Sequence, residues 1–299
     1  MMTAWAASLV PPLEAGGDGR LKPLPIDELT EKVAGLRRLL VELTCKTGGS
    51  YLAQALSSID MLSALFYRKL RFRPGEPDWP DRDRFLLSPG HYALGLYVVL
   101  ADLGYFPRDW LMSFKDDGSP VELCTHRGTL PGVEVSGGSL GQVLSVGVGM
   151  ALHAKLRHKP HGVFVLMSDG EQDEGQIWEA AASAAHFGLS NLRALIDKNG
   201  YQVDGPTAEV MDMEPLGDKY RAFGWQVMEI DGNDLDAVVS ALDRIDPGPG
   251  RPTVIIGNTT RGKGLSFMEG RSEFHYSRLD GDLGDRARQE LLRGGTDAA

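Results

Sequence analysis

Cysteine is scarce in this sequence, which has only Cys45 and Cys124 among its 299 residues. Two cysteines without CxxC spacing are too few for a disulfide framework and lack the pattern of a cysteine-ligated metal site. We therefore expect the chain to work in a reducing compartment, and the predicted location is cytoplasmic.

Positive charge and long apolar runs are also in short supply. Lys and Arg number 31 against 41 Asp and Glu, which gives a net charge of −10 at pH 7. This balance argues against a nucleic-acid partner. No segment approaches the roughly 18 uninterrupted apolar residues that a membrane helix requires, so no membrane partner is expected. The apolar start of the chain has no positive region before it, and residues 1–25 are interpreted as an N-terminal tail.

What the sequence does contain is an alternation of helical and strand patterns. The segments that predict helices are 26–44, Ser58 to 66, 92–103, a short one from Pro107, 141–157, 172–187 and 235–245. Short apolar runs predict strands at 85–87, 163–167, 192–196, 225–230 and 253–257. This order predicts an α/β fold, a doubly wound parallel sheet with helices on both faces.

Residues 115–140 interrupt this pattern. The segment has many Gly, Pro, Ser and Thr residues and no clear period. Loops of this length in compact domains are usually functional or disordered, and we interpret this one as functional. Since no repeat or low-complexity linker divides the chain, one domain is predicted over residues 26–280, followed by a C-terminal tail over 281–299.

Polar residues follow two neighbouring predicted strands. Asp169-Gly170 stands at the end of one strand and Asn199-Gly200 at the end of the next. Because the carboxyl ends of parallel strands meet at one edge of a sheet, the side chains of Asp169 and Asn199 are expected to converge. Carboxylate and amide oxygens suit a hard cation such as Mg²⁺, which usually keeps phosphate oxygens or water in its shell. The ligand would then be a diphosphate.

Gly170 and the helix after it fit the same interpretation. A glycine lets the backbone approach a phosphate without a Cβ in the way, and the start of a helix offers free N–H groups to an anion. Either dipeptide alone would more often be an ordinary turn. Their occurrence at the ends of consecutive strands favours the phosphate cradle.

These residues and four further motifs resemble the transketolase family. Asp169-Gly170 and Asn199, with Glu174-Gly175 and Glu179 between them, resemble its thiamine diphosphate motif. The other matching segments are Leu87-Ser88-Pro89-Gly90-His91, Pro131-Gly132-Val133-Glu134, Gly138-Ser139-Leu140-Gly141-Gln142 and Gly262-Lys263-Gly264-Leu265-Ser266-Phe267-Met268-Glu269. The resemblance extends from about Ile26 to Tyr276, which is most of the chain.

The resemblance implies a thiamine diphosphate-binding fold, with thiamine diphosphate and Mg²⁺ (or Ca²⁺ or Mn²⁺) as cofactors. The implied metal ligands are Asp169, Asn199 and the main-chain oxygen of Tyr201. The implied cofactor contacts are His91, Gly138, Ser139, Leu140, Asp169, Gly170, Glu171, Glu174, Asn199 and His275. The implied catalytic residues are His91, His126 and His275, with His126 facing substrate hydroxyls. Without such motifs, a lone histidine is more often a solvated or hydrogen-bonded side chain.

A partner chain is also implied by the resemblance. In the family, a glutamate from a second, pyrimidine-binding domain activates the cofactor. Only about twenty residues follow Tyr276 here, too few for a domain of roughly 100 residues. We therefore expect the N-terminal subunit of a split transketolase, completed by a separate C-terminal subunit in an α2β2 heterotetramer. The implied reaction transfers a two-carbon ketol unit from a ketose or ketose phosphate to an aldose.

Two positions near the expected substrate site depart from the family pattern. Lys46 stands where the family has a histidine, and Arg127 stands where it has a proline. An ammonium only donates hydrogen bonds, so it cannot replace an imidazole as an acceptor or proton carrier. We expect Lys46 or Arg127 to engage a carboxylate or another anion of an unusual substrate. Neutral drift with an unchanged reaction is the alternative.

Two other functions stay open at this point. A two-oxo acid decarboxylase or acyloin-forming α subunit with a non-standard substrate shares the metal motif, although the GSLGQ segment favours transketolase. A cofactor-binding or regulatory subunit whose partner lacks the activating glutamate is the non-enzymatic alternative, against which the intact metal motif argues. The small-molecule substrate would accordingly be a sugar or an oxo acid.

Overall fold

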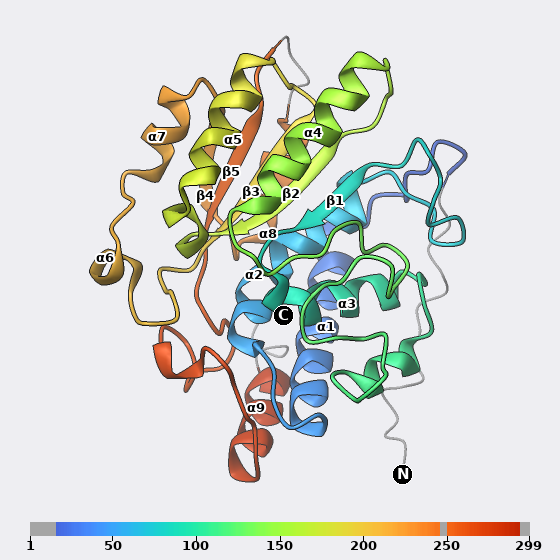
Figure 1. Cartoon of the computed structure of the whole chain (residues 1–299). Helices are drawn as coiled ribbons and strands as arrows, with labels where there is room; N and C mark the ends of the chain where they lie inside the picture. The colour runs from blue at the N-terminus through green and yellow to red at the C-terminus, as the bar shows by residue number, and fades with distance from the viewer. Residues whose placement is uncertain (1–15, 246–249, 294–299) are drawn as a thin grey trace.

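A parallel sheet organises the chain. The computed structural model describes residues 16–245 and 250–293, and within them five strands pair in the order β1-β2-β3-β5-β4, all parallel (Figure 1). Their bounds are β1 Arg84–Leu87, β2 Val163–Ser168, β3 Leu192–Lys198, β4 Gln226–Asp231 and β5 Thr253–Asn258. The predicted α/β class is confirmed.

The central strands are buried on both faces, which explains their continuous apolar sequences. Along β2, Val163 and Val165 belong to one hydrophobic core, whereas Phe164 and Leu166 belong to the other. This alternation follows from the two-residue period of a strand, in which successive side chains point to opposite faces.

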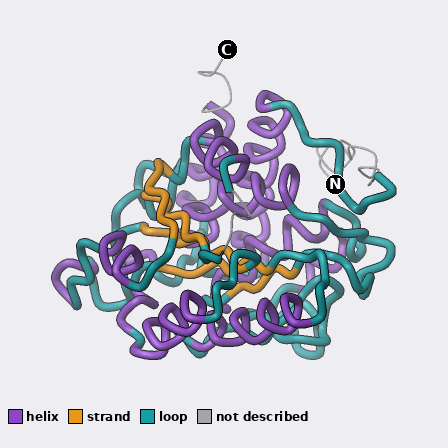
Figure 2. Tube along the Cα trace, turned by 90° about the horizontal axis from the view of Figure 1, so that it is seen from above, coloured by secondary structure: helices purple, strands orange, loops and turns teal. Residues whose placement is uncertain are grey.

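Helices cover both faces of the sheet (Figure 2). One core packs under α4 (Gln142–Leu156), α5 (Gly175–His186) and α7 (Leu216–Ala222). The other packs against α1 (Ile26–Lys46), α2 (Leu52–Ala64), α3 (Ala93–Asp102) and α8 (Leu235–Asp243). The short helical elements are α6 (Thr207–Val210), a π-helical turn at Leu65–Lys69, and 3₁₀ turns at Gly90–Tyr92, Arg108–Ser113, Gly170–Asp173 and Ser272–Phe274.

The start of α2 differs from the sequence-based expectation. The helix begins at Leu52, so Ser58 is an interior residue and not its cap. All thirteen residues of α2 are buried, and the Ser58 hydroxyl donates to the main-chain oxygen of Gln54 one turn earlier. A serine that satisfies its hydroxyl in this way tolerates a buried helix interior.

The expected domain boundaries are also revised. Leu21 and Leu24 are buried in the core, which places the described residues 16–25 on the domain and not in a tail. Helix α9 (Asp282–Arg293) lies against α1 (Figure 1), where the Arg288 guanidinium contacts the Glu42 carboxylate at 2.7 Å. Residues 1–15 and 294–299 lie outside the described part. No helix in the described residues is long and apolar enough to cross a membrane.

Candidate active site

The carboxyl ends of β2 and β3 bring Asp169 and Asn199 to the same edge of the sheet. The Asp169 N–H donates to the main-chain oxygen of Asp197, the next-to-last residue of β3, at 3.2 Å. The Gly200 N–H, directly after Asn199, donates to Asp169 Oδ2 at 2.6 Å. The expected convergence of the two strand ends is therefore present in the structure.

The buried Asp169 carboxylate accepts hydrogen bonds but forms no salt bridge with a described residue. Its side chain accepts from the Gly200 and Gly170 N–H groups, and the residue is only 7% exposed. Burial and the nearby Asp197 carboxylate raise the pKa of Asp169 to about 7. No salt bridge to Asp169 occurs among residues 16–245 and 250–293. A divalent cation would supply the missing positive charge, so the site fits a metal ion.

Asn199 is oriented by a residue that the sequence analysis did not single out. Its amide nitrogen donates to Asp197 Oδ2 and to the Tyr92 hydroxyl, both at 3.0 Å, while Oδ1 accepts from the Tyr201 N–H at 3.1 Å. Asp197 is completely buried and also accepts from Ser57 and Thr259. An acidic residue within an apolar strand was the signal that could have identified it.

Glu171 joins the ends of three segments. Its carboxylate accepts from the Ser88 hydroxyl after β1, from the Gly141 N–H at 2.6 Å before α4, and from the Ser168 N–H at 3.3 Å. The residue is fully buried. Because the carboxylate is engaged by the protein, the predicted contact of Glu171 with a diphosphate stays a prediction.

The Gly138-Ser139-Leu140 segment reaches the same edge because two glycines allow a close approach. A Cβ on Gly90 would lie 2.6 Å from the main-chain carbon of Gly137, and the Gly138 N–H donates to the Ser88 oxygen at 3.0 Å. Gly138 and Ser139 are exposed, and Leu140 is half-buried.

Gly170 and Glu174 have local structural roles. A Cβ on Gly170 would lie 2.8 Å from the Gln202 side chain, so the space that the sequence analysis assigned to a ligand is bordered by that residue. Glu174 is exposed and directly precedes α5. A Cβ added at Gly141 would lie 2.6 Å from the Cβ of Glu174. The geometry therefore leaves their predicted cofactor contacts as predictions.

Two of the three predicted catalytic histidines lie together. The rings of His91 and His275 have centroids 5.6 Å apart, and the Tyr51 ring lies 5.2 Å from the first and 5.4 Å from the second. Burial, with smaller contributions from His275 and Arg261, lowers the pKa of His91 to about 3. Burial and then Arg261 lower the pKa of His275 to about 4. Both rings are therefore neutral at pH 7 and can each donate one hydrogen bond.

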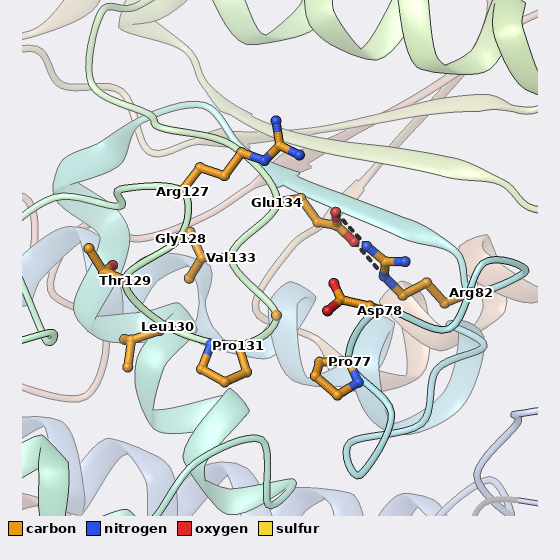
Figure 3. Close-up of a pocket in the computed structure, with 11 residues that line it drawn as sticks. Pro77, Asp78, Arg82, Arg127, Gly128, Thr129, Leu130, Pro131, Val133 and Glu134 are labelled. Atoms are coloured by element: carbon orange, nitrogen blue, oxygen red, sulfur yellow. Dashed lines mark hydrogen bonds and ion pairs between the residues drawn. The ribbon is translucent and has the colours of Figure 1, made fainter.

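His126 and Arg127 lie elsewhere on the 115–140 loop. The His126 side chain is 63% exposed, with Nδ1 3.7 Å from the Glu122 carboxylate. Arg127 lines a pocket of about 300 Å³ together with Asp78 and the paired Arg82 and Glu134 (Figure 3). Among the described residues, neither His91 nor His275 lines this pocket. The predicted substrate roles of His126 and Arg127 are thus not supported by contact with the histidine pair.

Lys115, which the sequence analysis missed, lies beside the aromatic rings of Tyr276 and Phe114. Lys46 is exposed at the last residue of α1. Lys115 Nζ instead donates to the Gly49 oxygen at 2.8 Å and to the Tyr276 hydroxyl at 2.9 Å, and the Tyr276 ring packs against Tyr51. No period in the 115–140 loop predicted this position.

A sheet of this topology, with a buried acidic edge and glycine-rich loops at its carboxyl end, defines a cofactor-binding domain of the thiamine diphosphate type. The family model described as "Transketolase, thiamine diphosphate binding domain" matches residues 29–294. The chain belongs to the transketolase family. The predicted family and fold are confirmed.

Split members of this family match the chain over nearly their full length. The 6-deoxy-6-sulfo-D-fructose transketolase subunit SqwG of Clostridium sp. (strain MSTE9) is 40% identical over 90% of this chain and 98% of its own. An apulose-4-phosphate transketolase subunit from Actinobacillus succinogenes is also 40% identical, over 90% of this chain and 97% of its own. The chain therefore corresponds to the N-terminal subunit of a split transketolase, as expected.

The solved structure of transketolase from Campylobacter jejuni has the same fold in this region. It superposes with a TM-score of 0.84 at 28% identity, covering 90% of this chain and 43% of that one. This chain thus spans less than half the length of that transketolase.

Proposed function

We propose that this chain binds thiamine diphosphate and a divalent cation at the carboxyl edge of its sheet and, with a partner subunit, transfers a two-carbon ketol unit between sugars. The observation that carries the proposal is the buried Asp169 carboxylate, which accepts from Gly170 and Gly200 and has no cationic partner among the described residues. A carboxylate in that setting is costly unless a cation joins it.

The metal would be held by the Asp169 carboxylate, the Asn199 amide oxygen and the main-chain oxygen of Tyr201. These oxygen donors suit Mg²⁺, and also Ca²⁺ or Mn²⁺. We assign the diphosphate contact to the main chain of Gly170 and Glu171, directly after Asp169. When bound, the cofactor supplies the carbanion chemistry that breaks and forms the carbon–carbon bond.

The neutral His91 and His275 would donate hydrogen bonds to oxygen atoms at this edge. Tyr51 packs edge-on against both rings. His126 remains a proposed substrate contact only if its exposed loop is covered in the assembled enzyme.

A C-terminal, pyrimidine-binding subunit would complete the site. Two similar proteins carry the word "subunit" in their names, which supports a partner chain. We propose an α2β2 heterotetramer, which sedimentation of the co-expressed pair would test. The cytoplasmic location predicted from the free Cys45 and Cys124 is also kept as a proposal.

The substrate is proposed to carry an anionic group. Names of two similar proteins refer to a sulfonated or phosphorylated sugar. In this chain, Lys115 places an ammonium against the aromatic rings of Tyr276 and Phe114, and its two hydrogen-bond acceptors, Gly49 and Tyr276, are uncharged. We therefore assign the anion contact to Lys115 in place of Lys46 or Arg127.

The test is ketol transfer by the chain co-purified with its C-terminal partner, with thiamine diphosphate and Mg²⁺ added. Xylulose 5-phosphate, 6-deoxy-6-sulfo-D-fructose and apulose 4-phosphate serve as donors, an aldose phosphate as acceptor, and pyruvate as the competing two-oxo acid donor. Transfer from at least one sugar and none from pyruvate is expected. A cofactor-loaded complex that decarboxylates pyruvate but transfers no ketol group would overturn the proposal.

A further inference from the structure

Two hydrogen-bond donors meet at one ring nitrogen of His275. Arg261 Nη2 and Gln54 Nε2 each lie 3.0 Å from His275 Nδ1. A guanidinium has donors only, so its contact requires a lone pair on Nδ1. Gln54 Nε2 also donates to the main-chain oxygen of His275 at 3.1 Å, which fixes the amide with its nitrogen toward the ring.

Both donors are held in place by burial. Arg261 is 1% exposed, its Nη1 donates to the Gln202 oxygen at 3.2 Å, and its guanidinium lies 5.6 Å from the Tyr201 ring centroid. Gln54 is 3% exposed within α2, which is buried along its length. Neither side chain is placed to turn away from the histidine without losing these contacts.

The second ring nitrogen of His275, Nε2, is available to a ligand. A neutral imidazole has one N–H, and with Nδ1 as acceptor that hydrogen lies on Nε2. Within residues 16–245 and 250–293, His275 Nε2 makes no hydrogen bond. The charged or titratable groups that face the ring are Arg261, His91, Tyr51 and, at longer range, Asp204.

We propose that Arg261 and Gln54 are positioning residues that hold His275 as the neutral tautomer with its hydrogen on Nε2, so that the ring can only donate, and only from Nε2, to an oxygen atom of a bound ligand. The inference rests on the proposed function for the identity of that ligand, but the tautomer itself is a property of this chain alone. The lowered pKa of His275, caused first by burial and then by Arg261, agrees with it.

The tautomer can be measured directly on the full chain without cofactor or partner. Long-range ¹H–¹⁵N correlation spectra of histidine-labelled protein distinguish a protonated ring nitrogen from an unprotonated one, and His275→Asn identifies the signals. The wild-type ring is expected to show an unprotonated Nδ1 and a protonated Nε2 from about pH 5.5 to about pH 8. A ring that carries its hydrogen on Nδ1, or that is doubly protonated in this range, overturns the proposal.

Variants then assign the effect to the two donors. Arg261→Lys keeps a cationic donor and should retain the tautomer, whereas Arg261→Met with Gln54→Met should populate both tautomers and move protonation toward the ordinary histidine range near about pH 6.5. Gln226→Met, on the exposed edge strand β4, is the matched control and should leave the signals unchanged. Should the double variant not fold, Gln54→Met alone must still shift the Nδ1 resonance, and an unshifted resonance would remove Gln54 from the proposal.

This outcome is separable from that of the proposed function. Loss of ketol transfer in the assembled enzyme with the Nε2 tautomer intact would count against the reaction and not against the positioning role. An active enzyme in which His275 has the wrong tautomer would count against the positioning role and not against the proposed reaction. In the active pair, Arg261→Met is expected to lower kcat about 10- to 100-fold, with Arg261→Lys restoring most of it.

Discussion

The two halves of the candidate site respond to burial in opposite ways. On the acidic half, Asp169 and Asp197 are buried beside one another, and burial raises the pKa of each. On the histidine half, burial and Arg261 lower the pKa values of His91 and His275. Burial disfavours charge in both places, and the Arg261 guanidinium, which contacts His275 directly, also interacts electrostatically with Asp169 and Asp197. Asp169 forms no salt bridge among the described residues and is proposed to bind an external cation, whereas the neutral His91 and His275 are hydrogen-bond donors.

The largest expected effect lies on the acidic half. Asp169→Ala removes the carboxylate proposed to hold the metal, so ketol transfer by the assembled pair should fall on the order of a thousandfold. Asp218→Asn, an exposed position on α7, is the control and should stay near wild-type activity. Steady-state rates at saturating Mg²⁺ check this. An Asp169→Ala enzyme with full activity would contradict the proposed metal-binding role of Asp169 and, with it, the contrast between the two halves.

Asp197→Asn should affect the stability of the fold before it affects catalysis. The carboxylate accepts from Ser57, Tyr92, Asn199 and Thr259, and an amide of the same shape turns part of these contacts into donor against donor. We expect the free energy of unfolding to fall by about 3 kcal/mol, measured by urea denaturation. A change smaller than about 1 kcal/mol would show that Asp197 is not the organising acceptor of this half.

Acid should destabilise the histidine half. In the unfolded chain histidines take up a proton near about pH 6.5, whereas the folded values are about 3 for His91 and about 4 for His275. At these two histidines the unfolded state binds more protons between these limits, so their contribution to the free energy of unfolding falls as the pH drops from about 6.5 to about 4. Asp169, with a folded pKa of about 7, contributes in the opposite direction. The test is the difference in the free energy of unfolding between wild type and His91→Gln, which should fall by about 3 kcal/mol over this range because the variant lacks the His91 shift. An unchanged profile in that variant contradicts the assignment.

The smallest expected effect concerns the anion contact. Lys115→Met should raise the KM for an anionic donor about tenfold, because one charge-assisted hydrogen bond is lost. Lys46→Met is the matched control and should change KM little, since Lys46 is exposed at the end of α1. Equal effects of the two substitutions on KM would contradict the assignment of the anion contact to Lys115 and would favour Lys46, the position indicated by the sequence.

Sequence reasoning succeeded where physical periodicity was strong. Strands β2, β3 and β5 are apolar on both faces, and the ends of β2 and β3 placed Asp169 beside Asn199. It failed at Ser58, which is compatible with either a helix cap or a buried interior, because the outcome depends on packing that the local sequence does not encode.

The histidine half could be predicted only through resemblance. Gln54 and His275 stand 221 positions apart, and no local pattern links them. Lys115 and Arg127 both lie in or next to a loop without a period, so their side-chain environments were decided by tertiary contacts. The sequence indicated a cation near the substrate but not which of Lys46, Arg127 and Lys115 supplies it.

The antiparallel bridge between Ser50 and Ser277 carries a consequence for biosynthesis. A Cβ on Gly49 would lie 2.8 Å from the Ser277 oxygen, so this pairing of an early and a late segment demands glycine there. During translation the sheet can assemble once β5 has emerged from the ribosome, but His275 finds Gln54 only after about twenty further residues have been made. A nascent chain stalled in that interval would contain the strand ends that carry Asp169 and Asn199 but not the His91–His275 pair, so the histidine half forms later in synthesis than the acidic half.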